Sequence, residues 1–385
     1  MKKEVSLYIH IPFCFRKCLY CDFLSSSAKP EEIKYYSRVI QKEIKSFEPI
    51  SNIYSVKSIY FGGGTPSYID SIHIAEIMQQ IYSSFDINED AEITIECNPG
   101  TITEEKLKTY RTIGINRLSF GVQSANNNEL QILGRIHTFE QFRDNYNLAR
   151  RLGFDNISVD LMSGIPNQTL DSFKKTLDMI TELAPDHISV YSLILEEGTP
   201  FFDTYSKLPA SKELPDEHID RLMYHYTKTY LDERGYDRYE ISNYAREGRE
   251  SKHNIVYWTL GDYIGFGLGA SSYFDGRRFS NPRDKESYYD YAPSAYESHK
   301  FFEIQPKKET MEEFMFLGLR MMKGISVNEF NLKFGESFDE LYGGVTSRML
   351  EMDMLTFDGV NLKLTDKGID VSNRVLSNYL LPKEE

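Results

Sequence analysis

Long hydrophobic runs, an excess of positive charge and a disulfide framework are all missing from this sequence of 385 residues. No uncharged apolar run approaches the roughly 20 residues that a membrane-spanning helix needs. Lys and Arg number 44 against 58 Asp and Glu, and the resulting net charge of −14 repels phosphate backbones and anionic membrane surfaces. We therefore expect a soluble globular protein that has no membrane span and does not bind nucleic acid.

The N-terminal segment 1–12 also lacks the features of a targeting sequence. Its apolar part is only about seven residues long and is interrupted by His10 and Pro12, whereas a secretory signal needs a continuous apolar region. A transit peptide would be rich in Arg and Ser, which this segment is not. We expect a cytoplasmic protein.

Cysteine is scarce, with four residues, but three of these, Cys14, Cys18 and Cys21, fall within eight positions. Thiols stay reduced in the cytosol, where such clustering indicates metal binding or redox chemistry. Structural zinc usually takes two separated ligand pairs, and no second Cys-x-x-Cys or His-x-x-x-His follows here. Three thiolates on one loop can instead hold a 4Fe-4S cluster and leave one iron open. A zinc-stapled site stays the alternative. Cys97 lies in a strand pattern and is expected to be a buried small hydrophobe.

Strand and helix patterns alternate through the first half of the chain. Apolar alternation predicts strands, and three- and four-residue apolar spacing predicts helices between them. Such alternation implies right-handed crossovers and a parallel sheet, either an open doubly wound layer or a partial barrel. Ligands of both folds bind at the carboxyl ends of the strands, where the cysteine loop follows the first strand. The predicted strands are 5–10, 56–61, 91–96, 117–121, 157–161 and 187–195, and the helices are 31–47, 72–82, 103–113, 139–152 and 170–183.

Three parts are expected along the chain: a core over 1–205, an accessory region over 206–300 and a C-terminal domain over 301–385. The accessory region contains a Tyr- and Gly-rich stretch, 235–274, and then a charged link, 277–286. The last part has helical patterns at 312–322 and 338–352, short strands at 354–357 and 360–364, and a helix from about 366, in an order that resembles a winged helix. The DNA-binding role of such domains does not suit this net charge.

The spacing Cys14-x-x-x-Cys18-x-x-Cys21 after a first strand resembles the signature of the radical S-adenosylmethionine (SAM) superfamily. This resemblance implies that a 4Fe-4S cluster on the three cysteines binds SAM at its open iron and supplies the electron that cleaves SAM to a 5'-deoxyadenosyl radical. The protein supplies position and electrostatics. The glycine triplet 62–64, after the second strand, matches the loop that holds the SAM amino group, and its bare N–H groups are expected to face the ligand.

A closer resemblance is to the subfamily that contains oxygen-independent coproporphyrinogen dehydrogenase and the HemW group of heme chaperones. It is carried by segments 8–14, 62–67, 95–96, 121–124, 133–135 and 160–166. The implied fold is α/β, a partial (β/α)6 radical SAM barrel with an α+β accessory region and a small C-terminal winged-helix-like domain. Arg135 would bind the methionine carboxylate, and Tyr20 would stack on adenine. The implied SAM contacts are Tyr8, Tyr20, Gly63, Gly64, Thr65, Glu96, Gln123, Arg135 and Asp160.

Three features favour the heme chaperone group within this subfamily. The dehydrogenase motif has a further Cys two positions after the third cysteine, where this chain has Phe23, and it follows a longer N-terminal extension. Residues 253–258 match the HNxxYW motif associated with the chaperones, and they include the only tryptophan of the chain. A neutral imidazole is a good axial ligand for heme iron, so His253 is the expected heme ligand.

The expected function is therefore binding of heme and its delivery to acceptor hemoproteins. The alternative is an enzyme that decarboxylates coproporphyrinogen III with SAM in heme biosynthesis. No catalytic residue is assigned, and a homodimer is one open oligomeric state.

Overall fold

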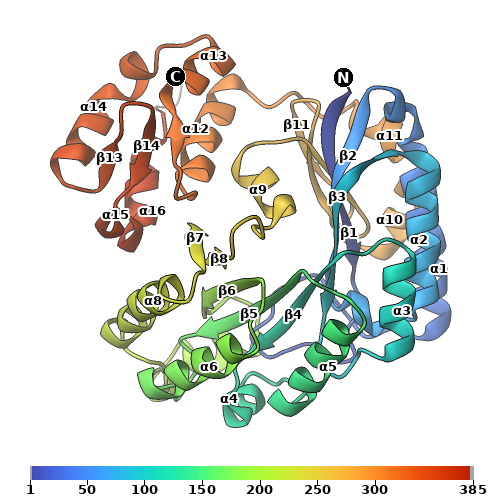
Figure 1. Cartoon of the computed structure of the whole chain (residues 1–385). Coiled ribbons are helices and arrows are strands. Elements are labelled where there is room, and N and C mark those ends of the chain that lie inside the picture. The colour runs from blue at the N-terminus through green and yellow to red at the C-terminus, as the bar shows by residue number, and fades with distance from the viewer. Residues whose placement is uncertain (1, 382–385) are drawn as a thin grey trace.

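Six parallel strands form the centre of the fold in the computed structural model, which describes residues 2–381. A doubly wound sheet reverses its strand order at a switch point, whereas a barrel keeps the order of the chain. The observed order does not reverse, and the sheet curves in Figure 1, so the fold is the partial barrel and the predicted fold class is confirmed. The strands are β1 (Lys3–Ile11), β2 (Tyr54–Gly63), β3 (Asp86–Cys97), β4 (Arg117–Gln123), β5 (Ile157–Ser163) and β6 (His187–Ser192).

Helices connect these strands and cover the outer side of the curved sheet (Figure 1). Several begin at a capping side chain that accepts a backbone N–H, as Asp70, Thr103 and Thr169 do. The prediction missed the six-residue α4, which is too short to show a periodicity. Across residues 2–381, each helix is too short or too polar to cross a lipid bilayer. The helices are α1 (Pro30–Ser46), α2 (Ser71–Ser84), α3 (Glu104–Thr112), α4 (Asn127–Ile132), α5 (Phe139–Arg151) and α6 (Leu170–Glu182).

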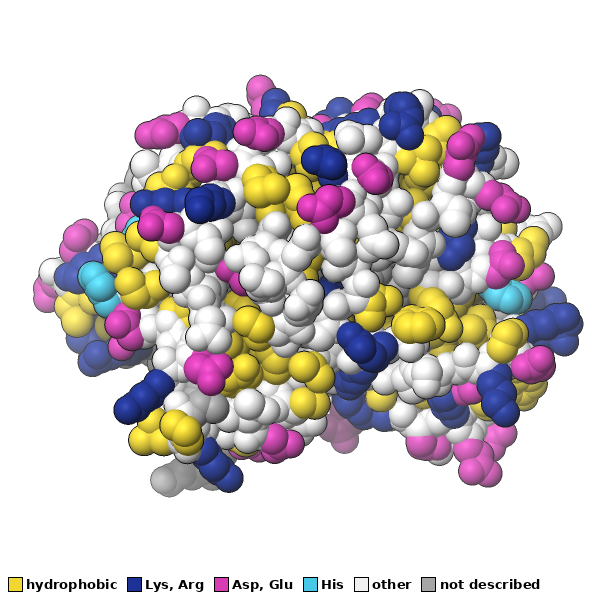
Figure 2. Space-filling view, turned by 90° about the horizontal axis from the view of Figure 1, so that it is seen from below, with side chains coloured by type: hydrophobic (Ala, Val, Ile, Leu, Met, Phe, Trp, Pro, Cys, Tyr) yellow, Lys and Arg dark blue, Asp and Glu magenta, His cyan; other side chains and the backbone are white. Residues whose placement is uncertain are grey.

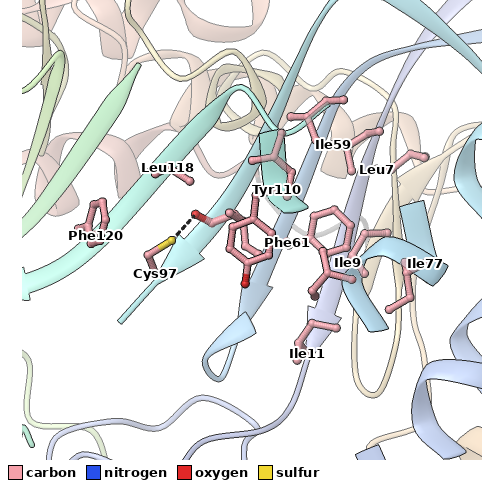
Figure 3. Close-up of a cluster of buried hydrophobic side chains, with 14 of the residues drawn as sticks. Leu7, Ile9, Ile11, Ile59, Phe61, Ile77, Cys97, Tyr110, Leu118 and Phe120 are labelled. Atoms are coloured by element: carbon pink, nitrogen blue, oxygen red, sulfur yellow. Dashed lines mark hydrogen bonds between the residues drawn. The ribbon is translucent and has the colours of Figure 1, made fainter. Parts of the chain in front are cut away.

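Side chains alternate between two faces along each central strand, as the two-residue period of a strand requires. On β1, Leu7, Ile9 and Ile11 point outward and pack with Phe61 and the helices (Figure 3). Cys97 lies in the same apolar layer, 2% exposed, where its thiol donates to the carbonyl of Ile95 over 3.7 Å. The prediction that Cys97 is a buried hydrophobe is confirmed. The opposite face carries the polar positions and lines the inside of the barrel.

The accessory region extends this sheet at both edges. Beside β1, β9 (Tyr263–Phe266) runs parallel and continues to antiparallel β10 (Ser271–Phe274) and β11 (Arg277–Ser280). Beside β6, β8 (Asn243–Ala245) and β7 (Asp237–Glu240) are antiparallel. The expected charged link at 277–286 is therefore wrong at both ends, since residues 277–280 form β11 and residues 285 and 286 begin the helix Lys285–Tyr291. A charged sequence also suits an edge strand. The short helix α7 (Pro200–Tyr205) ends the core, and the helices of the accessory region are α8 (Glu217–Asp232), α9 (Lys252–Trp258), α10 (Lys285–Tyr291) and α11 (Ala295–His299).

The C-terminal part has a small sheet in the order β12-β14-β13 and forms most of a second hydrophobic core, to which Leu260 and Tyr273 of the accessory region also contribute. Its order of helix, strand, two helices and two strands, with the first strand paired to the last, is the winged-helix arrangement. The divisions expected near residues 205 and 300 stay predictions about folding units. The elements are α12 (Lys307–Gly318), β12 (Ile325–Ser326), α13 (Val327–Phe334), α14 (Phe338–Glu351), β13 (Leu355–Phe357), β14 (Asn361–Leu364), α15 (Asp366–Asp370) and α16 (Ser372–Leu376).

The buried carboxylate of Glu43 joins α1 to the accessory region. It accepts hydrogen bonds from the backbone N–H of Gly267 at 2.9 Å, from Nδ2 of Asn281 at 2.6 Å and from the hydroxyl of Tyr288 at 2.6 Å. Burial raises the pKa of Glu43 to about 8, from an ordinary value of 4.5. Folding therefore favours the neutral carboxyl.

Because that pKa is raised, Glu43 contributes stability that is complete below about pH 4.5 and is lost as the pH rises through about 8. Glu43→Gln cannot titrate at this position. We expect the melting temperature of the wild type, relative to that of Glu43→Gln, to fall between about pH 5 and pH 9 in thermal unfolding scans. A difference in melting temperature that stays constant over this range would contradict the assignment.

Candidate cluster and cofactor site

The three clustered cysteines lie on a closed loop at the carboxyl end of β1. Two backbone hydrogen bonds close the loop, from the N–H of Cys14 to the carbonyl of Ser26 at 3.1 Å and from the N–H of Ser26 to the carbonyl of Pro12 at 2.9 Å. Further along, the N–H of Leu19 donates to the carbonyl of Leu133 at 3.2 Å. Cys14, Cys18 and Cys21 are free thiols held on a defined backbone.

Each thiol has its own surroundings. The sulfur of Cys14 lies 3.4 Å from the hydroxyl of Thr65, and that of Cys18 accepts from Nη1 of Arg135 at 3.6 Å. Burial raises the pKa of Cys21 to about 11. In the described part of the chain, no three His, Cys, Asp or Glu side chains are grouped closely enough to hold one metal ion. A 4Fe-4S cluster, in which each thiolate binds a different iron, does not need such a grouping.

The glycine triplet packs against the cysteine loop. The N–H of Gly64 donates to the carbonyl of Ile11 and that of Thr65 to the carbonyl of Phe13, both at 2.8 Å. A Cβ on Gly64 would lie 2.8 Å from the carbonyl oxygen of Phe13, so only glycine permits this approach. The expectation that the bare N–H groups of the triplet face a ligand is therefore wrong for Gly64, and the N–H of Thr65 is engaged in the same way. Since an ammonium group only donates, carbonyl oxygens suit it better.

Arg135 reaches the cysteine loop from the turn after α4. Besides Cys18, its guanidinium donates to Oδ1 of Asn98 at 2.7 Å and to the carbonyl of Gly121. Its Nε is buried and has no hydrogen-bond partner among the described residues. An unpaired N–H of a guanidinium beside the cysteine loop suits a carboxylate. The side chains of Gln123 and Arg135 both pack on Gly121, where a Cβ would lie 3.1 Å from Nε2 of Gln123 and 3.4 Å from Nη2 of Arg135. The backbone φ of Gln123 is 71°, a left-handed conformation that is uncommon outside glycine.

Two carboxyl groups face the inside of the barrel near its mouth. Glu96, at the end of β3, accepts from the hydroxyl of Tyr60 at 3.0 Å, and Asp160 on β5 accepts from Ser119 at 3.1 Å. Burial, followed by the charge of Asp160, raises the pKa of Glu96 to about 8, and burial also raises the pKa of Asp160. These carboxyls and Gln123 can pair with hydroxyl and amino groups of a ligand.

The two predicted tyrosine contacts differ in their surroundings. Tyr8 on β1 stacks with Tyr60 at a ring-centroid distance of 6.3 Å, and its hydroxyl lies 3.0 Å from Nδ1 of His10. Tyr20 packs edge-on against Phe201 at 6.2 Å in a small apolar cluster and interacts with Arg135. Stacking of Tyr20 on adenine stays a prediction, because one edge of its ring is already covered.

His253 lies on α9, inside the barrel and 1% exposed. Nδ1 is 2.9 Å from the hydroxyl of Ser58 and Nε2 is 2.8 Å from the hydroxyl of Tyr257. Its ring stacks on Tyr60 at 5.1 Å. The structure thus does not present His253 as an open ligand, since both ring nitrogens are engaged. Heme ligation by His253 stays a prediction that requires one of these hydrogen bonds to break.

Sequence reasoning missed Asn98, Ser67 and Tyr60. The hydroxyl of Ser67 accepts the N–H of Asn98 at 2.9 Å, and Asn98 in turn holds Arg135. Tyr60 could have been found from strand alternation, because it occupies one of the alternate positions of β2 whose side chains point into the barrel. Asn98 lies in a loop and Ser67 in the three-residue 3-10 helix Pro66–Tyr68, and neither is long enough to give a periodic signal.

Figure 2 shows the molecule from below, the side at which the central strands end, with patches of hydrophobic side chains and charges of both signs around them. Loops that follow these strands expose large apolar side chains, including Phe15 at 63%, Phe23 at 59% and Ile194 at 67%. A flat apolar ligand could cover such side chains.

Comparisons with known proteins agree with this geometry. The Radical SAM superfamily profile matches residues 8–180, and the HemN C-terminal domain profile matches residues 305–371. The structure of coproporphyrinogen III oxidase (HemN) from Escherichia coli, a radical SAM enzyme, has a TM-score of 0.83 over 98% of this chain and 90% of that one. At 22% identity, this likeness shows the fold.

Sequence relatives cover nearly the whole chain. Heme chaperone HemW of Lactococcus lactis subsp. lactis (strain IL1403) is 37% identical over 99% of this chain and 98% of its own length. Heme chaperone HemW of Bacillus subtilis (strain 168) is 34% identical over 97% and 99%. The mitochondrial radical S-adenosyl methionine domain-containing protein 1 of Danio rerio is 30% identical over 99% and 88%. This chain therefore belongs to the radical SAM superfamily and, within it, to the HemW family.

Proposed function

We propose that this protein is a heme chaperone on a radical SAM scaffold, which binds heme and transfers it to acceptor hemoproteins. The observation that carries the proposal is the full-length similarity to relatives named heme chaperone HemW, at 37% and 34% identity. Phe23, where the dehydrogenase motif has a further cysteine, and the HNxxYW segment add to it.

Cys14, Cys18 and Cys21 would hold the 4Fe-4S cluster. Three free thiols on one closed loop at the carboxyl ends of the strands fit such a cluster, and they leave one iron for SAM. When bound, the cluster supplies the open iron and an electron. The loop fixes the thiols, and the buried guanidinium of Arg135 lies 3.6 Å from the sulfur of Cys18.

The residues around the loop would hold SAM. Arg135 offers its unpaired Nε to the carboxylate, while Glu96, Asp160 and Gln123 offer acceptors to the amino and hydroxyl groups. Tyr8 and Tyr20 offer ring surfaces, and the backbone carbonyls of the triplet offer further acceptors. Gly63, Gly64 and Thr65 therefore act through shape and carbonyl oxygens more than through N–H donation.

Heme would bind at the mouth of the barrel, where the exposed side chains of Phe15, Phe23 and Ile194 suit an apolar macrocycle. Addition of heme to the reconstituted protein should give a Soret band that co-elutes with the protein in gel filtration at about one heme per chain. If no Soret band co-elutes with the protein, the proposal that it binds heme is wrong.

Ligation of heme by His253 can be tested separately. If His253 ligates the iron, His253→Ala should change the visible and resonance Raman spectra of the heme-loaded protein and leave the iron-sulfur absorption intact. The matched control is His187→Ala, because His187 is also buried between a serine and a tyrosine hydroxyl, at 2.8 and 2.9 Å. Identical heme spectra of the wild type and both variants would place the axial ligand elsewhere.

Two further parts of the proposal concern the protein in the cell, that hemoproteins accept the heme and that the protein is cytoplasmic; a third question is whether the heme-loaded form is a homodimer. The relatives named heme chaperone support the first, and the absence of a spanning helix in residues 2–381 is consistent with the second. Gel filtration with and without heme tests the third.

A further inference from the structure

His10 lies at the end of β1, between the cysteine loop and the inside of the barrel, and is 7% exposed. Its Nε2 is 2.9 Å from the carbonyl of Leu24, and its Nδ1 is 3.0 Å from the hydroxyl of Tyr8. A carbonyl oxygen only accepts, so Nε2 carries the hydrogen. Nδ1 then accepts from Tyr8, and a neutral imidazole satisfies both bonds.

Two glycines from different segments pack against His10. A Cβ on Gly63, where φ is 109°, would lie 2.5 Å from the His10 ring. A Cβ on Gly267, where φ is 106°, would lie 2.6 Å from the carbonyl oxygen of His10 and 3.1 Å from its Cβ. His10 fits between these segments only because both positions are glycine: Gly63 leaves room for its ring and Gly267 for its backbone and Cβ.

The backbone of His10 is fixed as well. Its carbonyl accepts from the hydroxyl of Tyr36 at 2.7 Å, and that hydroxyl accepts the N–H of Leu268 at 3.0 Å. The strand, α1 and the turn after β9 therefore meet at this residue, so the imidazole has a rigid base.

The bond to Leu24 reaches the cysteine loop between Cys21 and the closing residue Ser26. The side chain of Leu24 is backed by Gly269, where a Cβ would lie 2.6 Å from its Cδ2. The loop is thus tied at its two ends by Cys14 and Ser26, in its middle by Leu19, and after Cys21 by the imidazole of His10.

We propose that His10 is a positioning residue, which holds the Cys21 side of the cysteine loop and the side chain of Tyr8 in one arrangement before iron binds. The part of this inference that concerns the cluster rests on the proposed function. The part that concerns the loop does not, because the contacts of His10 to Leu24 and Tyr8 are between protein atoms alone. Loss of His10 should free the loop and speed release of iron, with no cysteine removed.

The test compares His10→Ala with His187→Ala. His187 is also a buried histidine, and both of its ring nitrogens are hydrogen-bonded to hydroxyls. It lies on β6, and none of its hydrogen bonds reaches the cysteine loop. Hydrogen exchange of the iron-free protein reports on residues 14–26, and iron transfer from the reconstituted protein to a chelator reports on the cluster. We expect His10→Ala to lose protection in 14–26 and to release iron at least tenfold faster than the wild type. His187→Ala should match the wild type in both readouts, even where it lowers the melting temperature.

His10→Gln supplies a conservative variant, because its amide can donate to Leu24 and accept from Tyr8. It should restore part of the protection and slow the release of iron relative to His10→Ala, and it serves as the main variant if His10→Ala does not fold. The proposal would be overturned if both His10 variants exchanged the backbone hydrogens of residues 14–26 at the wild-type rate. It would also be overturned if His187→Ala sped the release of iron as much as His10→Ala. If the wild type binds no cluster, the proposed function fails, while the exchange of the iron-free loop still decides the role of His10.

Discussion

Replacing Cys14, Cys18 or Cys21 by alanine should abolish the 4Fe-4S cluster. Each thiolate would bind a different iron, and the three sulfurs are the cluster's only expected protein ligands. The variants reconstituted with iron and sulfide under anaerobic conditions should lack the broad charge-transfer absorption near about 400 nm and the electron paramagnetic resonance signal of the reduced cluster.

Cys97→Ala is the matched control for this loss. Its sulfur lies in the apolar layer between the sheet and the helices, 2% exposed, and donates to the carbonyl of Ile95 (Figure 3). We expect it to keep both signals. Purified wild-type protein that holds zinc at these three cysteines and cannot take up iron would contradict the radical SAM assignment and favour the zinc alternative.

Arg135→Ala should weaken SAM binding at least tenfold. A charge-assisted hydrogen bond contributes about 1.5 to 3 kcal/mol, and about 1.4 kcal/mol corresponds to a tenfold change in affinity. In the wild type, the contacts to Asn98 and to the Gly121 carbonyl orient the guanidinium, and the alanine variant loses these contacts as well. Equilibrium binding of SAM to the reconstituted protein is the measurement.

Because Arg135 also contacts Cys18, the iron content of each variant has to be compared first. Arg135→Lys keeps the charge but cannot form two parallel hydrogen bonds, so its affinity for SAM should lie between those of the wild type and Arg135→Ala. Equal SAM affinities of all three proteins, at equal iron content, would show that another basic group binds the carboxylate.

The barrel core could be predicted because its signals are local. The two-residue alternation of Leu7, Ile9 and Ile11 and the cysteine spacing are both visible within a few positions. The end of β6 was predicted too far, at 195 instead of Ser192, because apolar residues continue past the last strand hydrogen bonds into the mouth.

The burial of His253 could not be predicted, because its partners are distant in the sequence. Ser58, which binds its Nδ1, is 195 positions away, and Glu92, whose carboxylate accepts the N–H of His253, is 161 positions away. From the sequence alone, a motif that contains His, Tyr and Trp suggests an accessible ligand site. The long-range contacts that bury His253 are not visible in the sequence. The role of His10 was hidden for a similar reason, since the need for glycine at Gly63 and Gly267 becomes visible only in three dimensions.

The central claim, that this protein carries heme and does not make its precursor, is tested most directly by one anaerobic comparison. The reconstituted protein, with SAM and a low-potential reductant, is incubated with coproporphyrinogen III or with heme, and the tetrapyrroles are separated and identified by mass. The account predicts that coproporphyrinogen III is recovered unchanged, whereas heme stays with the protein and can be passed to an apo-hemoprotein. Formation of a decarboxylated porphyrinogen, with no retained heme, would contradict it.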